Sequence, residues 1–591
     1  MSEQANAAVP EGLMTPMRIM WDVPIAMDDG LELMADVFLP EAEGRYPIVF
    51  SYGPYAKGLH FEDGYPSAWH AMVEAKPDVA EGSSNVLQSW EVADPEKWVR
   101  WGYGLVRVDS RGAGRSPGLL EPLAPRETQD IYDCIEWVGV QPWSNGKVGM
   151  SGVSYYAINA WMAAATQPPH LAAIAAWEGM ADFYRDSAYH GGILCTFWDN
   201  WYWMQTKKVQ HGVGSRAWRS RANGQLVAGD VDLTEEELAA NRVDFGQQIR
   251  SHPFATRWHE ERSADWSRVE VPLLSAANIG GQGLHARGNY EAFMRAASEH
   301  KYLEVHGLHH WTEYYTDYGN DVMRRFFDCY LKGDDSGWKD QPRVLIQVRH
   351  VDGTFVERGE DAWPIPRTRW TELELDAATR TLGADGAAPA SVTYDAWESG
   401  SDAGVLFRTS PLAEETELTG PLAAKLFVSS STSDADLFLV VRVFDPSGHE
   451  VTFQGHSDPH TPVASGWLRV SHRALDPELS LPYRPYHPHD DKKPLTPGEV
   501  YEVDVEIWPT CIVIPAGYTL GLSVRGTDYR YPHLDGDQPR LSNFANALTG
   551  VGPFLHDDPR DRPREVYGGE VTIHTGGEHR SWLYAPVIPK G

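Results

Sequence analysis

The stretch that most restricts the fold of this chain is KVGMSGVSYYAINAWMAA, residues 147–164. A short strand-like run ends at Gly152, Ser154 follows, and an alanine-rich segment of helical character begins at once. A serine on such a sharp turn projects its hydroxyl from the end of a sheet. The helix N-terminus adds free backbone N–H groups and a positive dipole end. The stretch therefore predicts Ser154 as a nucleophile and the backbone amide of Tyr155 as an oxyanion donor.

The rest of the chain shows three textures. Strand-like runs such as 46–51 and 104–109 alternate with helical spacing, which is typical of a mainly parallel sheet with helices on its faces. A tryptophan-rich segment without strand signals interrupts this rhythm, as a helical cap would. After it the alternation resumes, and the last part of the chain is rich in short strands and turns. We predict an α/β domain in two parts, the cap between them and a β-sandwich, with boundaries at 1–190, 191–265, 266–343 and 344–591.

Charge and cysteine content exclude several classes of protein. The chain has 83 acidic and 51 basic residues and a formal net charge of −32, which opposes binding to nucleic acids or anionic membranes. Its four cysteines are scattered and lack metal-ligand spacing. We see no signal peptide and no apolar run long enough to span a bilayer. We therefore expect a soluble cytoplasmic protein without cofactor or metal, acting on a small molecule, and as a weaker expectation a homodimer.

Several segments resemble one family of hydrolases. The stretch GVSYYA resembles the G-x-S-Y-x-G turn of the cocaine esterase and X-prolyl dipeptidyl aminopeptidase family, with Ala157 in place of the last glycine. VDSRGAGRS at 108–116 and PWSNGKVG at 142–149 are similar to further family motifs, and LTGP at 418–421 with DADLFLVVRVFDPSG at 434–448 resembles its C-terminal domain. The resemblance implies an α/β-hydrolase sheet, an inserted helical cap and an all-β jelly-roll sandwich of the galactose-binding type.

The same resemblance suggests an oxyanion donor and a base. GPYAK at 53–57 is similar to the family's N-P-Y-x-K element, so the Tyr55 hydroxyl is expected to stabilise the oxyanion beside the Tyr155 amide. The family's histidine follows the last strand of the sheet, where this chain has GLHHW. The register favours His310 over His309. His285 and His300 are expected to lie in a loop and on a helix surface, without a role.

The acid of the expected triad departs from the family pattern. The family has an aspartate just after the preceding strand, whereas this chain has ANIGGQG at 277–283, with Gly281 or possibly Gly280 at that position. Glu178, at the end of the apolar run 171–177, is the best replacement because it preserves the order serine, acid, histidine. Asp182 and Asp186 are weaker alternatives.

A serine, a histidine and an acid beside an oxyanion hole perform acyl transfer. We therefore expect a serine hydrolase that cleaves an ester, with Trp198 and Trp201 lining its pocket. One alternative is an X-prolyl, amino-acid ester or amide hydrolase. Another is a catalytically impaired hydrolase fold that serves in binding, which the missing aspartate would favour. Metal-dependent hydrolysis by the loop with His487 and His489 has the least support.

Overall fold

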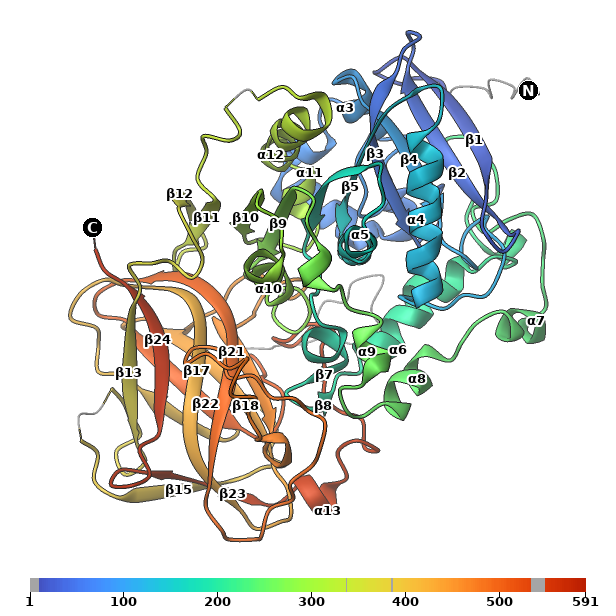
Figure 1. The fold of residues 1–591 in the computed structure, drawn as a ribbon. Coiled ribbons are helices and arrows are strands. Elements are labelled where there is room, and N and C mark those ends of the chain that lie inside the picture. Colours follow the sequence, from blue (N-terminus) through green and yellow to red (C-terminus); the bar gives the residue numbers. More distant parts are fainter. Residues whose placement is uncertain (1–9, 336, 384–385, 533–547, 591) are drawn as a thin grey trace.

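The computed structural model describes residues 10–335, 337–383, 386–532 and 548–590. Figure 1 shows two lobes, with the N-terminus on one and the C-terminus on the other. The first lobe is built on a ten-stranded sheet in the order β1-β2-β4-β3-β5-β6-β9-β10-β11-β12. Its strands are β1 Met17–Ala26, β2 Glu32–Pro40, β3 Tyr46–Gly53, β4 Gly104–Asp109, β5 Ser144–Val153, β6 Leu171–Trp177, β9 Leu273–Asn278, β10 Lys301–His306, β11 Val344–Arg349 and β12 Phe355–Glu360.

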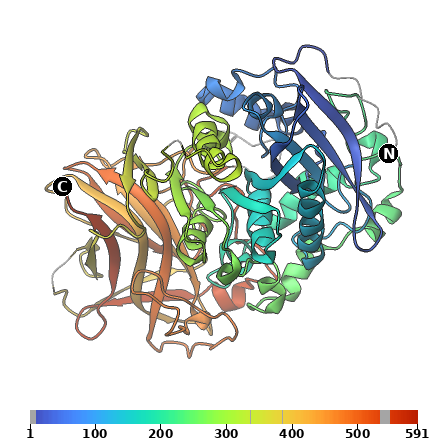
Figure 2. The same cartoon turned by 45° about the horizontal axis from the view of Figure 1, so that its top comes forward.

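The centre of this sheet is parallel, from β4 through β3, β5, β6, β9 and β10 to β11. Parallel strands need crossover connections, and the helices that supply them cover both faces of the sheet (Figure 2). This explains why β4 and β9 are buried along their whole length. The helices of this lobe are α1 Phe61–Gly64, α2 Pro66–Ala75, α3 Pro95–Arg100, α4 Pro125–Gly139, α5 Tyr155–Thr166, α10 Gly288–Arg295, α11 Thr312–Tyr315 and α12 Asp317–Phe327.

The segment between β6 and β9 forms the cap. It contains a two-stranded hairpin, β7 Tyr189–His190 and β8 Ile193–Leu194, and four short helices. These are α6 Phe197–Trp201, α7 Glu235–Ala240, α8 Phe245–Ser251 and α9 Arg257–Glu260. Helices this short are not stable in isolation. The cap therefore depends on tertiary packing, mainly of aromatic side chains.

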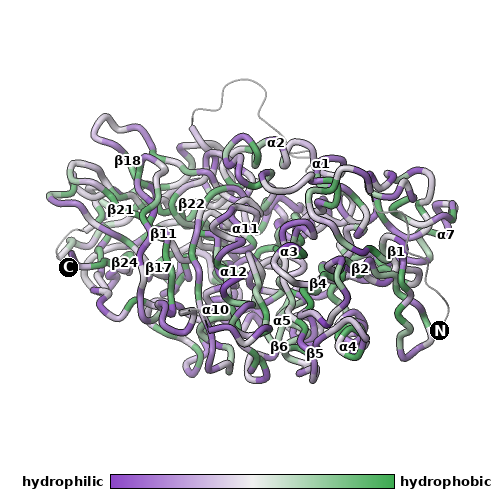
Figure 3. The backbone as a smooth tube through the Cα atoms, turned by 90° about the horizontal axis from the view of Figure 1, so that it is seen from above, coloured by the Kyte–Doolittle hydropathy of each residue, from purple (hydrophilic) through white to green (hydrophobic). Residues whose placement is uncertain are grey.

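The second lobe is all β. Its sheet runs β15-β23-β17-β21-β20-β18-β22-β16-β14-β13-β24, and a further pairing of β17 with β24 closes it on itself. A separate apolar cluster fills its interior, and apolar stretches lie in the strands of both lobes (Figure 3). The strands are β13 Arg369–Asp376, β14 Thr381–Leu382, β15 Ala390–Asp395, β16 Val405–Arg408, β17 Thr416–Ser430, β18 Asp436–Phe444, β19 Glu450–Val451, β20 Ala464–Arg469, β21 Tyr501–Ile514, β22 Thr519–Arg525, β23 Glu570–Thr575 and β24 Trp582–Ile588; the short helix α13 Arg564–Tyr567 lies between β22 and β23 in the chain.

The predicted α/β fold with an inserted cap and a C-terminal all-β domain is confirmed. β11 and β12, which follow the predicted boundary at 343/344, belong to the first sheet, since β11 pairs with β10 in parallel and β12 pairs with β11. Buried and exposed residues alternate in strands of both kinds of sheet, so the local pattern could not assign β11 and β12 to either one. Among the residues that the structure describes, no helix is both long and apolar enough to cross a membrane.

Candidate active site

Ser154 lies on a strained turn between β5 and α5. Its backbone has φ 57° and ψ −112°, a conformation that side-chain-bearing residues rarely adopt. The turn also requires Gly152, because a Cβ atom there would lie 2.3 Å from the Tyr156 Cβ and 3.0 Å from the Glu91 carbonyl oxygen. Ser154 is the residue before the first turn of α5, so the Tyr155 amide belongs to the helix N–H groups that have no partner within the helix.

The hydrogen-bond partner of the nucleophile is His285. Ser154 Oγ lies 3.2 Å from His285 Nε2, and His285 Nδ1 lies 3.3 Å from the carbonyl oxygen of Gly179. Since a carbonyl only accepts, Nδ1 carries the proton and Nε2 accepts from the serine hydroxyl. Burial, together with the nearby charge of His310, lowers the pKa of His285 to about 3. At neutral pH its ring is therefore an uncharged acceptor.

His310, the predicted base, faces two carboxylates instead of the serine. Its Nδ1 lies 2.7 Å from Glu178 Oε2 and its Nε2 lies 3.0 Å from Glu91 Oε1. Burial opposes protonation of His310, but Glu178 and Glu91 outweigh it and raise its pKa to about 9. The expected hydrogen bond from Ser154 to His310 is thus replaced by one to His285, because both nitrogens of His310 are engaged elsewhere.

Glu178, the predicted acid, does contact His310. It directly follows β6 and is fully buried. Besides His310 it accepts hydrogen bonds from His306 Nε2 at 3.2 Å, Asn278 Nδ2 at 3.3 Å and the Trp311 amide at 3.2 Å. Burial opposes its ionisation, yet the charge of His310 and the hydrogen bonds from both histidines hold its pKa well below the usual range. The expected pairing of Glu178 with His310 is present in the structure.

The turn after β9 explains why the acid is not in its usual place. A Cβ atom on Gly280 would lie 2.8 Å from the Gly455 Cα, and one on Gly281 would lie 3.0 Å from the His285 Cβ. The amide of His285 closes this turn on the Gly281 carbonyl at 2.8 Å. The space that an aspartate would need is therefore occupied by the turn that delivers His285 and by a loop of the second lobe.

His285 was expected to have no role, and two further residues of the site give no signal in the sequence. Glu91 lies in the loop before α3, with its carbonyl accepting from the Val153 amide at 3.0 Å, and burial raises its pKa to about 7. His456 comes from the second lobe. Its amide donates to the Gly280 carbonyl, its carbonyl accepts from the His310 amide, both at 2.9 Å, and its ring stacks on that of His310 at 4.1 Å. No local motif marks either residue, because each reaches the site only through the fold.

His285, His310 and His456 have nitrogens within 4.8 Å of one another, close enough for a cation. Their rings, however, are nearly parallel, with interplanar angles of 13°, 18° and 29°. Stacked rings direct their nitrogens to the side, here toward Ser154 and the two glutamates. We interpret this group as a stack of rings that positions His285 and His310.

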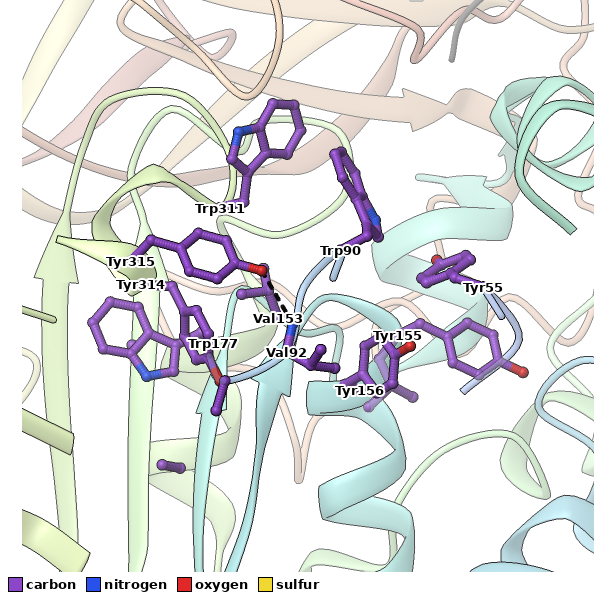
Figure 4. Close-up of a cluster of buried hydrophobic side chains, with 14 of the residues drawn as sticks. Tyr55, Trp90, Val92, Val153, Tyr155, Tyr156, Trp177, Trp311, Tyr314 and Tyr315 are labelled. Carbon is purple, nitrogen blue, oxygen red and sulfur yellow. Dashed lines mark hydrogen bonds between the residues drawn. The ribbon is translucent and has the colours of Figure 1, made fainter. Parts of the chain in front are cut away.

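Tyr55 lies against the first turn of α5, beside Tyr155 and Tyr156 (Figure 4). The indole N–H of Trp201 donates to the Tyr55 hydroxyl at 3.0 Å. Because the tyrosine oxygen accepts this bond, its own proton is free to be donated. The Tyr155 side chain is turned away from this hydroxyl, since its own hydroxyl donates to Glu127 at 2.6 Å. Of the two donors on Tyr155, the hydroxyl and the backbone amide, only the amide is therefore a candidate for the oxyanion hole.

The two cap tryptophans that were expected to line a pocket are both buried. Trp198 and Trp201 are each 3% exposed and pack against one another. Trp198 also contacts Phe183 and Phe245 in the interior of the cap. Trp201 reaches the site through its hydrogen bond to Tyr55 and through its ring, which stacks on that of Tyr155.

The other histidines named in the sequence analysis take no part in the contacts of Ser154. His300 is exposed and His309 lies next to His310 without facing Ser154. His487 and His489 are buried. Both nitrogens of His487 meet backbone carbonyls, those of Ala474 and Asp504, so this ring has no nitrogen left for a metal.

Known proteins of the hydrolase family suggested by the sequence resemble this chain along nearly its whole length. Residues 29–312 match the X-Pro dipeptidyl-peptidase (S15 family) profile, and residues 336–583 match the X-Pro dipeptidyl-peptidase C-terminal non-catalytic domain. Cocaine esterase from Rhodococcus sp. (strain MB1 Bresler) is 24% identical, with 99% of each chain covered.

Solved structures agree. A CocE/NonD family hydrolase from Staphylococcus aureus is 32% identical with a TM-score of 0.82, covering 97% of this chain and 94% of that one. An α-amino acid ester hydrolase, 17% identical with 99% of each chain covered and a TM-score of 0.64, shares the fold. With the strand-to-helix turn at Ser154 and both domain profiles in place, the chain belongs to the S15 family of cocaine esterase and X-Pro dipeptidyl-peptidase type, and it is a serine hydrolase.

Proposed function

We propose that this chain hydrolyses carboxylic esters through an acyl-enzyme formed on Ser154. The observation that carries the proposal is the 3.2 Å hydrogen bond from Ser154 Oγ to the neutral His285 ring, on a strained turn at a helix N-terminus. A serine hydroxyl is a weak nucleophile until an adjacent base takes its proton. We assign the oxyanion hole to the hydroxyl of Tyr55, which packs against Tyr155 and Tyr156, and to the amide of Tyr155 at the start of α5.

In the proposed reaction, His285 Nε2 takes the Ser154 proton while Oγ attacks the ester carbonyl carbon. The negative charge that develops on the carbonyl oxygen is stabilised by the Tyr55 hydroxyl and the Tyr155 amide. His285 then gives its proton to the departing alkoxide oxygen. Water, deprotonated by His285, attacks the acyl-enzyme and releases the carboxylic acid and Ser154. The Gly179 carbonyl holds His285 in the required tautomer throughout.

The charged groups near His285 act on its protonation in opposite directions, since the charge of His310 lowers its pKa and that of Glu178 raises it. Glu91, His310, Glu178, His306 and Glu304 form one continuous chain of contacts. With the carboxylates ionised and both rings protonated, this chain has three negative and two positive charges, an excess of one negative charge. Within this chain the Glu178 charge favours a transient positive charge on His285, and the His310 charge opposes it more strongly. In this proposal Glu178 and His310 are positioning residues.

The Ser154–His310–Glu178 triad expected from the sequence is the competing assignment. Its Glu178 to His310 Nδ1 contact is in place, but Glu91 would have to leave His310 Nε2 before the serine could use it. The two assignments differ in pH dependence. A base with a pKa near 3 is competent at every pH above that value, whereas a base with a pKa near 9 gains activity about tenfold per unit as pH rises toward 9.

An ester fits the site better than a peptide with a free amino terminus. Relatives of that kind need a carboxylate to hold the substrate ammonium. Three aspartates that follow β6 in the chain are already paired with arginines: Asp182 with Arg185 at 2.8 Å, Asp186 with Arg287 at 2.7 Å, and Asp199 with Arg250. An X-prolyl or amino-acid ester substrate is therefore the second choice.

The deciding experiment measures kcat/KM for p-nitrophenyl acetate and butyrate between pH 5 and 10. We expect a nearly flat profile for the wild type and loss of turnover in Ser154→Ala and His285→Gln. A rise of tenfold per unit up to pH 9, together with loss of turnover in His310→Gln but not in His285→Gln, would assign the base to His310. A wild type that neither turns over nor shows a burst would contradict the proposal and favour a binding role.

We also propose a cytoplasmic location. It is supported by Cys134, Cys195, Cys329 and Cys511, which are all buried free thiols, as proteins of reducing compartments have.

A further inference from the structure

A second cluster of ligand-type side chains lies outside the active site, at the seam between the cap and the second lobe. His190 ends β7, Cys195 follows β8, and His556 belongs to the segment before α13. Figure 1 places β7 and β8 beside the all-β lobe. The three side chains are buried, with exposed fractions of 1%, 2% and 1%, and their ligand atoms lie within 4.8 Å of one another.

The backbone holds these residues in place. The Thr196 amide donates to the Leu555 carbonyl at 2.8 Å, and the Cys195 amide donates to the Ala188 carbonyl at 3.0 Å. The residues next to Cys195 and His556 are thus directly paired across the seam. The site is therefore preformed, because backbone hydrogen bonds already hold the segments that carry the three side chains next to one another.

The two rings meet edge to edge. His190 Nδ1 lies 2.8 Å from His556 Nε2, with an interplanar angle of 63°. The far nitrogen of each ring faces an oxygen that accepts: His556 Nδ1 is 2.8 Å from Asp528 Oδ1, and His190 Nε2 is 3.3 Å from the Asp186 carbonyl. A neutral ring has one N–H. If each ring donates outward, two lone pairs face each other at the near nitrogens, and a cation between them is needed.

We propose that His190, Cys195 and His556 bind one zinc ion. Two imidazoles and a thiolate are ligands that zinc prefers, and metal-binding histidines usually donate their other N–H to a carboxylate or a carbonyl, as both rings do here. Cys195 binds as the thiolate and releases its proton to solvent. Three protein ligands leave one tetrahedral position for water. The ion would fasten the cap hairpin to the second lobe, independently of ester hydrolysis.

The experiment uses the full chain expressed with added zinc. We expect about one zinc per chain by elemental analysis. After removal of zinc with a chelator, titration with Co²⁺ should produce tetrahedral visible bands and a sulfur-to-cobalt charge-transfer band in the near ultraviolet. Cys195→Ser should abolish the charge-transfer band, and His556→Gln should lower the metal content at least tenfold. Chelation should lower the thermal midpoint, and zinc should restore it.

Matched controls come from the same chain. Cys134→Ser, a buried free cysteine of α4, and His456→Gln, from the stacked histidines of the active site, should retain the ion and the cobalt spectrum. If His456→Gln removes the ion while Cys195→Ser keeps it, the ion belongs to the active site and the proposal is wrong. If the wild type contains no zinc and gives no cobalt spectrum, the seam holds only a hydrogen-bonded histidine pair beside Asp528, which also overturns the proposal.

Discussion

The two buried histidine clusters of this chain are built from the same residue type but differ in how their rings face one another. In the active site, His285, His310 and His456 stack nearly parallel, and the nitrogens of His285 and His310 turn outward to a serine, a backbone carbonyl and two carboxylates. At the seam, His190 and His556 meet edge to edge with their nitrogens converging. Stacking distributes protons among separate partners, whereas an edge-on pair directs two lone pairs at one point. Ring orientation, more than residue identity, separates a proton-transfer site from a metal site.

The largest expected effect is that of Ser154→Ala. It removes the nucleophile, so kcat for a p-nitrophenyl ester should fall on the order of 10⁵ to 10⁶-fold. The thermal midpoint and the zinc content should not change, because the seam cluster does not depend on this hydroxyl. Turnover that survives in the purified variant would remove Ser154 from the reaction.

His285→Gln tests the stacked cluster, and His190→Gln tests the edge-on cluster. The first should lower kcat on the order of 10⁴-fold, the cost of losing a triad component. The second should leave kcat within about threefold while the bound zinc is lost. Equal effects of the two variants on both readouts would mean that the clusters are not functionally separate.

Tyr55→Phe removes the proposed oxyanion donor. A lost donor of this kind lowers kcat by about 10² to 10³-fold with little change in KM. Trp201→Phe leaves the Tyr55 hydroxyl in place but removes the N–H that polarises it, so a smaller loss is expected. A change confined to KM in Tyr55→Phe would assign the tyrosine to substrate binding instead.

Glu91→Gln should have a modest effect on turnover, within about tenfold, because Glu91 contacts His310 and not the serine. Its distinctive readout is the pH profile. If His310 is the true base and Glu91 withholds its Nε2, the variant should become more active near neutral pH. A lower or unchanged activity favours His285.

The smallest effects concern stability against pH. His310 has a folded pKa raised to about 9, so its contribution is fully present below the unfolded value near 6.5 and is lost as pH rises toward 9. From this shift we expect a loss on the order of 3 kcal/mol of unfolding free energy between pH 6.5 and 9. Denaturant unfolding at several pH values measures it. The slope should flatten in His310→Gln and persist in His556→Gln.

The sequence predicted the fold because that fold rests on local signals. Period-two and helical patterns marked the sheet, the cap and the all-β lobe, and the glycine before Ser154 marked the turn. It did not show that β11 and β12 join the first sheet, since a strand pattern does not say which sheet the strand joins.

The site was predictable only in part. Ser154 carries a local backbone signature, and the position of Glu178 at a strand end led to its contact with His310. His285 looked like a loop residue, because its partner Ser154 is 131 positions away in the chain. Glu91 and His456 gave no signal, as one is an acid in a loop and the other belongs to a different domain.

By itself the sequence determined the order of strands and helices, the serine on its turn and the class of reaction, all of which follow from residues near one another in the chain. The tertiary structure decided which histidine meets the serine and which residues share the seam. A hydrogen bond is gained or lost when the distance between two groups that packing brings together changes by a few tenths of an ångström. No spacing along the chain encodes such distances.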